Sequence, residues 1–541
     1  MTELINLIKE GNLSDLEELL TINSIRSNLK QQYWDFIPQL CELLSEESEA
    51  RSKCIEHVML TITEVATSAK DLLIVFMEQF DKFICDFRFK LLLKPISKCL
   101  DNLSSKKGYS LGLVLSVLNA HIKSITIGDK DQDLHRIFER LNIALDFVYP
   151  FARQIAVTDA STKEYRDKNN KQLEEILLFV VKVLAHPLSN IDVTLSDDSL
   201  IKIYQKLGDI LSCCSRDAIS TIEKLEDRNQ FIMFRKKQIE HQRSSLNTND
   251  LENMDTDLLD VEEPIPEIGI SMIPFLATIE GVNLAIPLIY RADFVTGSFL
   301  NSSIRLLKDT SEIIVKKGIN IAIHMFSTMQ EDSTSYQGIK KLNKTLEAIY
   351  QILLRCPNID LRRYASKIVP ELIKVLSNES KYIFFERIIN HSHQAVKGYG
   401  IILLKNSLQE NMTFKKENEY LKGEHLDKLF NDIFLFNVEK DILDNAEFLL
   451  DALSLFRYLI SVDKRNETGI IEKADYVEKN FLKPLEKSID LAKAHYQLEI
   501  QNCNATEQMN SRKEFLQAGI VRIEMIESIL AICSDLKAKK K

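Results

Sequence analysis

Apolar residues recur every three or four positions along almost the whole of this chain. The pattern is clear in "LSDLEELLTI" at 13–22, "QLEEILLFVVKVLAH" at 172–186 and "LIKIYQKLGDILSCC" at 200–214. Because an α-helix turns once every ~3.6 residues, this spacing places the apolar side chains on one face of a helix. No convincing strand-like alternation bounded by Asn-Gly or Asp-Gly turns is found. The sequence therefore predicts an all-α protein.

Glycine and proline, the residues that most often interrupt helices, are scarce. The chain has 15 Gly and 11 Pro in 541 residues, well below the average frequencies of about 7% and about 5%. Several predicted helices, such as "FKLLLKPISKCL" at 89–100, are apolar on more than one side, as a helix between two neighbours in a layered stack must be. Helix pairs recur about every 40 residues. We therefore expect a HEAT/armadillo-like helical-repeat array.

One stretch, 242–267, breaks the helical pattern. It has no apolar periodicity, carries eight acidic residues from Asp250 onward, and ends in Pro264 and Pro266. This composition predicts a disordered or loosely held acidic linker. The linker would divide the chain into an N-terminal helical-repeat half at 1–241 and a C-terminal HEAT-like half at 268–541.

The sequence lacks the usual marks of export. Its first residues, "MTELINLIKEGNLSDLEELL", do not combine a basic start with an apolar core, and no run approaches the ~18 apolar residues of a membrane span. The nine cysteines form no disulfide framework spacing, which favours free thiols in a reducing compartment. We expect a cytoplasmic protein that is not bound to a membrane, with a nuclear pool as an additional location.

The charge is unevenly distributed. The net charge is −10, so a nucleic acid is not expected as a partner. Residues 338–405, here called the basic region, nevertheless hold 12 Lys and Arg against 5 Asp and Glu. Such a region indicates either one negatively charged partner surface or an ordinary solvated helical face.

The segment "NFLKPLEKSIDLAKAHYQLEIQN" at 480–502 places Ser488, His495 and Glu499 on one strip of a predicted helix, with Pro484 in its first turn. Ser488 and His495 would lie roughly 10 Å apart along the helix axis. A catalytic hydrogen bond needs about 3 Å between heavy atoms. The strip is therefore not a nucleophile and base, and we expect His495 to pair with Glu499 at a seam between helices.

Other signatures of chemistry are also missing. The chain has no glycine-rich phosphate loop, no H-E-x-x-H, no C-x-x-C and no G-x-S-x-G elbow. His391 and His393 could bind zinc only with ligands from elsewhere, and a solvated connection between helices is the simpler interpretation. We therefore expect a protein that is not an enzyme and needs no cofactor or metal. Helical-repeat arrays present long surfaces to other proteins.

Several segments resemble the glomulin family in collinear order, most closely in the C-terminal half. These segments are "RCPNIDLRR" at 355–363, "SKYIFFERIIN" at 380–390, "IILLKNS" at 401–407, "LSLFRYLI" at 453–460, "NFLKPL" at 480–485 and "KAHY" at 493–496. In the N-terminal half the likeness is thinner, with "KKGYSLGLVLSVL" at 106–118 as the best point.

The resemblance implies a HEAT-like protein, monomeric on its own, whose C-terminal half grips the RING subunit of cullin–RING ubiquitin ligases, with the cullin attached. Members of the family cover the RING face that would recruit a ubiquitin-conjugating enzyme and so inhibit ubiquitin transfer. The alternative is a general scaffold or adaptor for other clients, of the immunophilin or receptor-tail type.

The resemblance also implies candidate contact residues. Lys405 aligns with a lysine that contributes to the RING contact in the family, and Asn406 matches beside it. Arg457 and Tyr458 match family positions as well, either as partner contacts or as residues of helix packing.

Overall fold

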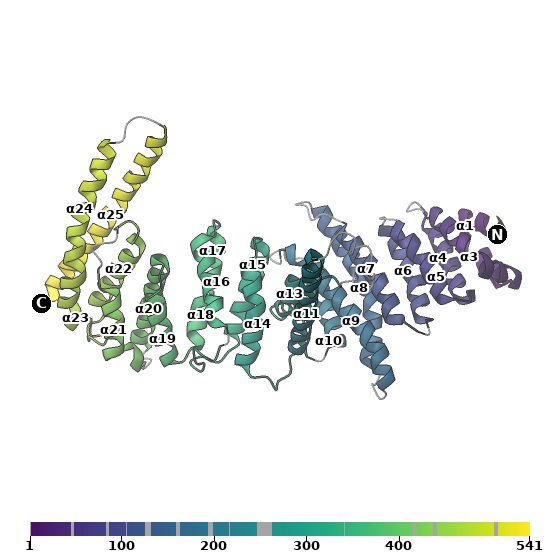
Figure 1. Ribbon diagram of the computed structural model, residues 1–541, viewed down its shortest axis with the longest axis horizontal. Helices are drawn as coiled ribbons and strands as arrows, with labels where there is room; N and C mark the ends of the chain where they lie inside the picture. The colour runs from purple at the N-terminus through teal and green to yellow at the C-terminus, as the bar shows by residue number, and fades with distance from the viewer. Residues whose placement is uncertain are drawn as a thin grey trace. The chain divides into compact units, whose positions relative to one another are not determined.

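The fold is given by a computed structural model of the protein, and Figure 1 labels most of its α-helices in chain order. It describes residues 2–44, 48–82, 86–103, 105–124, 131–157, 163–192, 198–215, 217–245, 262–339, 341–414, 418–436, 441–502 and 507–540. Within these ranges every named element is helical, and the only β-type pairing is an isolated parallel bridge between Thr334 and Leu376. The predicted all-α helical-repeat array is confirmed.

The chain divides into two compact units. The first comprises Met1–Arg291 and Asn301–Ile321, and the second comprises Ala292–Leu300 and Ala322–Lys541. The helices of the first unit are α1 (Thr2–Glu10), α2 (Leu13–Thr21), α3 (Asn23–Glu42), α4 (Glu49–Val65), α5 (Ala69–Lys82), α6 (Asp86–Asp101), α7 (Lys107–Lys123), α8 (Asp131–Val157), α9 (Lys163–Ala185), η1 (Leu188–Asn190), α10 (Asp198–Cys214), α11 (Ala218–Ser245) and α13 (Glu267–Leu276). Two helices, α14 (Ala292–Leu307) and α15 (Glu312–Ser327), contribute residues to both units.

The named elements of the second unit are also helices. Its helices are α16 (Leu342–Arg355), α17 (Ile359–Ala365), α18 (Ile368–Val375), α19 (Asn378–Ile389), α20 (Gln394–Phe414), η3 (Glu419–Leu421), α21 (Gly423–Ile433), α22 (Ala446–Val462), α23 (Ile470–Val477), η4 (Glu478–Leu482), α24 (Lys483–Asn502) and α25 (Glu507–Lys540).

The predicted acidic linker at 242–267 falls mostly on residues 246–261, which lie outside the described residues. At its edges, α11 extends to Ser245 and α13 begins at Glu267. The predicted division into 1–241, 242–267 and 268–541 therefore stays a prediction.

Helices of the first unit pack on several sides at once. α9 packs against α7, α8, α10 and α13. The approach of α13 to α9 is close enough that a Cβ on Gly269 would overlap the carbonyl oxygen of Val181. Only glycine allows the two backbones to lie this near to each other. The apolar faces predicted on more than one side of a helix are therefore used for packing.

A buried lysine joins α15 to η1 in the first unit. Lys317 is 2% exposed, and its Nζ donates hydrogen bonds to the carbonyl oxygens of Leu188 at 2.7 Å, Ser189 at 2.6 Å and Ile191 at 2.8 Å. Burial lowers the pKa of Lys317 to about 7. The negative charge of Asp192 opposes this shift. The ammonium group has three donors, and the three carbonyls accept all of them. Lys317 therefore holds α15 against the turn that follows α9.

Aromatic rings form part of the core of the second unit. The ring of Phe434 lies 5.8 Å from that of Phe430, 5.8 Å from that of Phe456 and 5.7 Å from that of Phe481, measured between centroids. These separations are those of favourable aromatic pairs. The cluster ties α21 and α22 to the π-helical turn η4.

The predicted helix at 480–502 does not begin at its proline. α23 runs through the π-helical turn η4 directly into α24, so Pro484 lies in the first turn of α24 but within a continuous helical segment. Proline has no N–H and its ring crowds the carbonyl four residues earlier. That carbonyl belongs to Asn480, and it accepts a hydrogen bond from the backbone N–H of Phe436 at 3.2 Å instead. The π-helical turn and this bond accommodate the proline.

No helix of the described ranges is both long enough and apolar enough to cross a lipid bilayer.

Replacing Lys317 should destabilise the first unit far more than replacing its neighbour. Lys317→Met removes the donor from the carbonyls of Ser189 and Ile191, and we expect the free energy of unfolding to fall by roughly 2–4 kcal/mol. Lys316 makes a surface ion pair with Asp192 at 3.0 Å. Lys316→Met should therefore change the free energy of unfolding by less than about 1 kcal/mol. Urea denaturation of both variants measures the difference. Equal losses of stability would show that the buried hydrogen bonds of Lys317 contribute no more than the surface ion pair of Lys316.

Candidate protein-binding site

The four predicted contact residues come from two helices that pack against each other. Lys405 and Asn406 lie on α20, and Arg457 and Tyr458 lie on α22. These two helices pack extensively against each other. Buried leucines on each helix, among them Leu404, hold the pair together. Residues far apart in the sequence are thus brought into one place.

Lys405 and Tyr458 are in direct contact. The Lys405 Nζ lies 5.7 Å from the centroid of the Tyr458 ring, over its face, and both side chains are half-buried. This is a cation–π interaction, which leaves the ammonium group able to donate hydrogen bonds to another molecule. Asn406 and Arg457 are exposed on the same two helices. Whether these residues contact a partner stays a prediction.

The structure adds Asp451 to this site, a residue that sequence reasoning missed. A Cβ on Gly398 of α20 would lie 2.6 Å from the Asp451 Oδ2, so the glycine makes room for this carboxyl group between α20 and α22. Burial raises the pKa of Asp451 to about 7, with Glu447 raising it further and Lys405 opposing the shift. The one available signal in the sequence was a lone acid within the apolar run "FLLDALSLF" at 448–456.

The protonation state of Asp451 decides whether Lys405 has a negative charge beside it. When the carboxyl group is protonated, it gives Lys405 no negative counter-charge within the protein. A lysine without an internal counter-charge is better able to bind a carboxylate of another molecule. The site therefore presents one cation on an aromatic platform.

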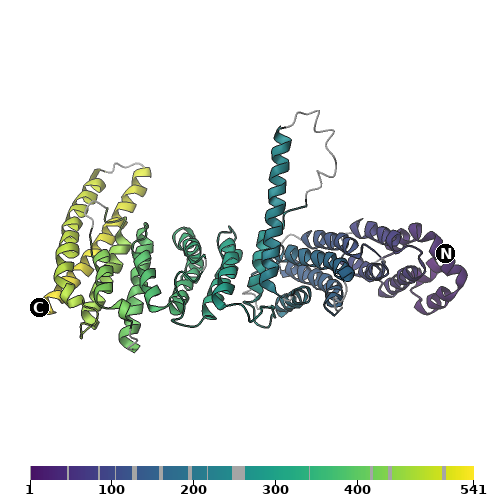
Figure 2. The same ribbon diagram turned by 60° about the horizontal axis from the view of Figure 1, so that its bottom comes forward.

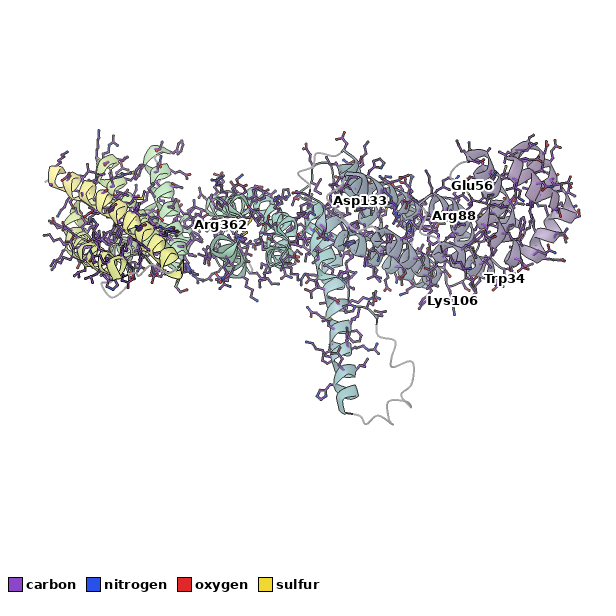
Figure 3. The ribbon with its side chains drawn as sticks, turned by 90° about the horizontal axis from the view of Figure 1, so that it is seen from above. Trp34, Glu56, Arg88, Lys106, Asp133 and Arg362 are labelled. Carbon is purple, nitrogen blue, oxygen red and sulfur yellow. The ribbon has the colours of Figure 1, made fainter. Side chains whose placement is uncertain are left out.

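The basic region divides into cations used within the fold and cations that face solvent. Lys381 pairs with Asp332, the Arg387 guanidinium lies 4.8 Å from the centroid of the Tyr336 ring, and Arg362, labelled in Figure 3, donates to the carbonyl of Cys356 at 2.6 Å. Lys344 and Arg355 on α16 are exposed and pair with no carboxylate in the described part of the chain. Only part of the charge excess is thus available to a partner.

The strip on α24 is not a catalytic arrangement. The Ser488 Oγ donates to the carbonyl of Pro484 at 3.0 Å, within its own helix. The His495 Nε2 lies 3.8 Å from the Glu499 Oε1, which confirms the predicted pair. The expected position at a seam between helices is wrong, because the His495 side chain is 67% exposed. The neighbouring Tyr496 turns inward instead, and its hydroxyl donates to Asp441 at 2.7 Å.

His391 and His393 cap their own connection. The His391 Nδ1 accepts the backbone N–H of His393 at 3.1 Å, and the His393 Nδ1 accepts that of Ala395 at 3.3 Å. The His391 ring also meets the ring of Tyr350 edge-on, 5.4 Å between centroids. Across the described ranges, no three His, Cys, Asp or Glu side chains are grouped so that they could hold a metal ion.

The region that contains this site is similar in sequence to known proteins. Residues 298–528 match a family model described as "Uncharacterised protein family, YAP/Alf4/glomulin". Glomulin of Mus musculus is 23% identical to this chain over 570 residues, covering 98% of the chain and 91% of that protein. Glomulin of Homo sapiens is 24% identical over 567 residues, with the same two coverages. Both α20 and α22 lie within the region matched by the family model.

Asp451 should make the stability of the second unit depend on pH. Because folding raises its pKa from 3.8 to about 7, the folded state keeps the proton over this range while the unfolded state loses it. Stability therefore falls as the pH rises from about 4 to about 7. Asp451→Asn stays neutral at every pH. Between pH 5 and pH 8, its free energy of unfolding should therefore rise by about 1 kcal/mol relative to that of the wild type, a figure already lowered because Asp451 is partly exposed.

Thermal unfolding at the two pH values measures this gain. Asp535→Asn, at an exposed position of α25, is the matched control and should follow the wild type. If Asp451→Asn also follows the wild type, Asp451 is ionised throughout and the assignment of a raised pKa is wrong.

Proposed function

We propose that this chain, which belongs to the glomulin family, inhibits cullin–RING ubiquitin ligases by binding their RING subunit through its C-terminal half. The bound protein would cover the face of the RING subunit that recruits the ubiquitin-conjugating enzyme. The observation that carries the proposal is the contact between Lys405 and Tyr458 on α20 and α22, within the region matched by the family model. Lys405 is the residue that the family resemblance links to the RING contact.

The charge of the second unit supports a protein partner with acidic groups. Lys405 lies over an aromatic ring beside a carboxyl group that burial keeps partly protonated near neutral pH. Lys344 and Arg355 add exposed positive charge on α16. Complementary charge between two proteins speeds their encounter and fixes their relative orientation. Acidic side chains on the partner would therefore be drawn to this part of the protein.

The proposed inhibition is steric and uses no catalytic residue of this chain. Each bound molecule would remove one RING face from the pool that can recruit the conjugating enzyme. Inhibition would then follow the fraction of RING subunit that is occupied, and full inhibition would need a molar amount comparable to that of the ligase. A rigid helical stack suits this role, because a large interface can form with little ordering of the binding surface.

Reversing the charge of Lys405 should weaken binding to the RING subunit. Lys405→Glu replaces an attraction with a repulsion and should raise the Kd by about 30-fold, which corresponds to about 2 kcal/mol. Lys405→Met keeps an apolar side chain over the Tyr458 ring, so its loss of affinity should be smaller. Titration calorimetry with a purified cullin–RING core measures both values, and thermal unfolding of the same samples tests whether the variants are folded.

Lys202→Glu is the matched control. Lys202 is exposed on α10 in the first unit, and its reversal should leave the Kd within about twofold of the wild type if binding uses the second unit. Equal effects of Lys202→Glu and Lys405→Glu would mean that the chain binds through its overall charge alone.

A ubiquitin transfer assay tests the inhibition itself. Discharge of a ubiquitin-loaded conjugating enzyme by the cullin–RING core should slow in proportion to the wild-type protein added and less so with Lys405→Glu. Binding without slower discharge would rule out occlusion. Absence of binding, with purification from cells recovering other clients and no cullin, would favour the scaffold or adaptor alternative.

A further inference from the structure

The later part of α11 carries an exposed surface that the proposed function does not use. This stretch of the helix stands clear of the neighbouring helices of its own unit, as the teal helix of Figures 2 and 3 shows. We define the α11 surface by four residues that lie on one broad side of the helix: Phe231, Phe234, Arg235 and Lys237. The two phenylalanines are 60% and 58% exposed. Large aromatic side chains left in water often mark a site of interaction.

Positive charge lies directly beside these rings. Arg235, Lys236 and Lys237 are all exposed, and none of them pairs with a carboxylate in the described ranges. The Arg235 guanidinium lies 5.9 Å from the centroid of the Phe231 ring. In a chain with a net charge of −10, a run of three such cations creates a local positive potential. Around the helix, Arg235 and Lys237 flank the two rings, whereas Lys236 lies on the opposite side. The surface thus joins two aromatic rings to two available cations.

The same helix already holds an acidic, apolar peptide segment of this chain. Both carboxylate oxygens of Glu262 lie 3.1 Å from an Arg228 Nη2. Three residues later, the backbone N–H of Ile265 donates to the Asn229 Oδ1 at 2.8 Å, and the Ile265 side chain is 4% exposed. Residues 262–266 are not helical. An extended segment therefore binds here with a carboxylate on arginine and an apolar side chain buried.

The α11 surface repeats the elements of that contact further along the helix. Arg235 follows Arg228 by seven residues, which is about two turns, so the two arginines lie on nearly the same side and roughly 10 Å apart along the axis. Phe231 and Phe234 offer apolar area next to Arg235. The first contact is filled by the chain itself, whereas the second presents its groups to solvent.

We propose that the α11 surface is a docking site for an acidic peptide segment of a partner protein that also carries aromatic or aliphatic side chains. Carboxylates of the segment pair with Arg235 and Lys237, and its apolar side chains pack on Phe231 and Phe234. This site lies in the first unit and is independent of the proposed capture of a RING subunit. Charge complementarity and the contact of Glu262 with Arg228 favour a carboxylate ligand over a nucleic acid or a bilayer.

Fluorescence anisotropy with a defined peptide tests the proposal. The probe is a short fluorescein-labelled peptide in which aspartate alternates with phenylalanine and leucine, and the control probe has lysine in place of aspartate. The full chain should bind the first probe at low salt, more weakly as salt is added, and should not bind the second. Failure of the full chain to bind the acidic probe, or equal binding of both probes, overturns the proposal.

Variants of α11 locate the site. Arg235→Glu combined with Lys237→Glu should weaken binding of the acidic probe by at least about tenfold, because two attractions become repulsions. Phe234→Ala should weaken it by about tenfold through lost aromatic contact. Lys224→Glu is the control, since Lys224 is exposed nearer the start of the same helix, and it should change binding by less than about twofold. All of these positions are exposed, so the variants are expected to fold.

Two further outcomes are decisive. If Lys224→Glu weakens binding as much as the double variant, the peptide responds to charge in general and the proposal is overturned. If the chain instead binds vesicles that contain phosphatidylserine, and Phe234→Ala abolishes that binding while the acidic probe is ignored, the surface is a membrane contact and the peptide proposal is wrong.

Discussion

The helices inside this chain have to bury apolar side chains against neighbours on more than one side. α9 meets this constraint against α7, α8, α10 and α13 together, and the contact with α13 requires a glycine at Gly269. A helix enclosed in this way cannot shift without opening a gap against one of its neighbours, because protein interiors are close-packed. The interior of the first unit is therefore tightly packed, and rigid surfaces bind other proteins with little loss of conformational freedom.

The same close packing decides how polar groups in the interior are satisfied. Lys317 is tolerated because three carbonyl oxygens meet its ammonium group. The carbonyl of Asn480, deprived of a helical partner by Pro484, receives a donor from the backbone of Phe436. Among the described residues, Asp451 meets no comparable set of donors, and burial raises its pKa instead. A buried polar group thus finds partners or gives up its charge, since an unpaired buried charge is costly.

The surface cations of the described residues differ in whether the fold already engages them. Lys381 and Arg387 are engaged with groups of the second unit itself, and so contribute to the fold more than to recognition. Lys405 in the second unit and Arg235 in the first each lie against an aromatic ring with the charged group open to another molecule. An aromatic ring restrains such a side chain while leaving its donors available, which reduces the entropy lost when a carboxylate binds.

The sequence by itself determined the fold class and the pairs that lie within one helix. Apolar periodicity and the scarcity of glycine and proline are local properties, and they were sufficient to predict an all-α array. The pair of His495 and Glu499 could be predicted because residues four apart always lie together on a helix. Only the tertiary structure decided that Lys405 meets Tyr458, that Gly398 makes room for Asp451, and that His495 faces solvent. These features depend on which helices pack together and at what distance, and this is set by the shapes of many side chains acting at once, which no short pattern in the sequence records.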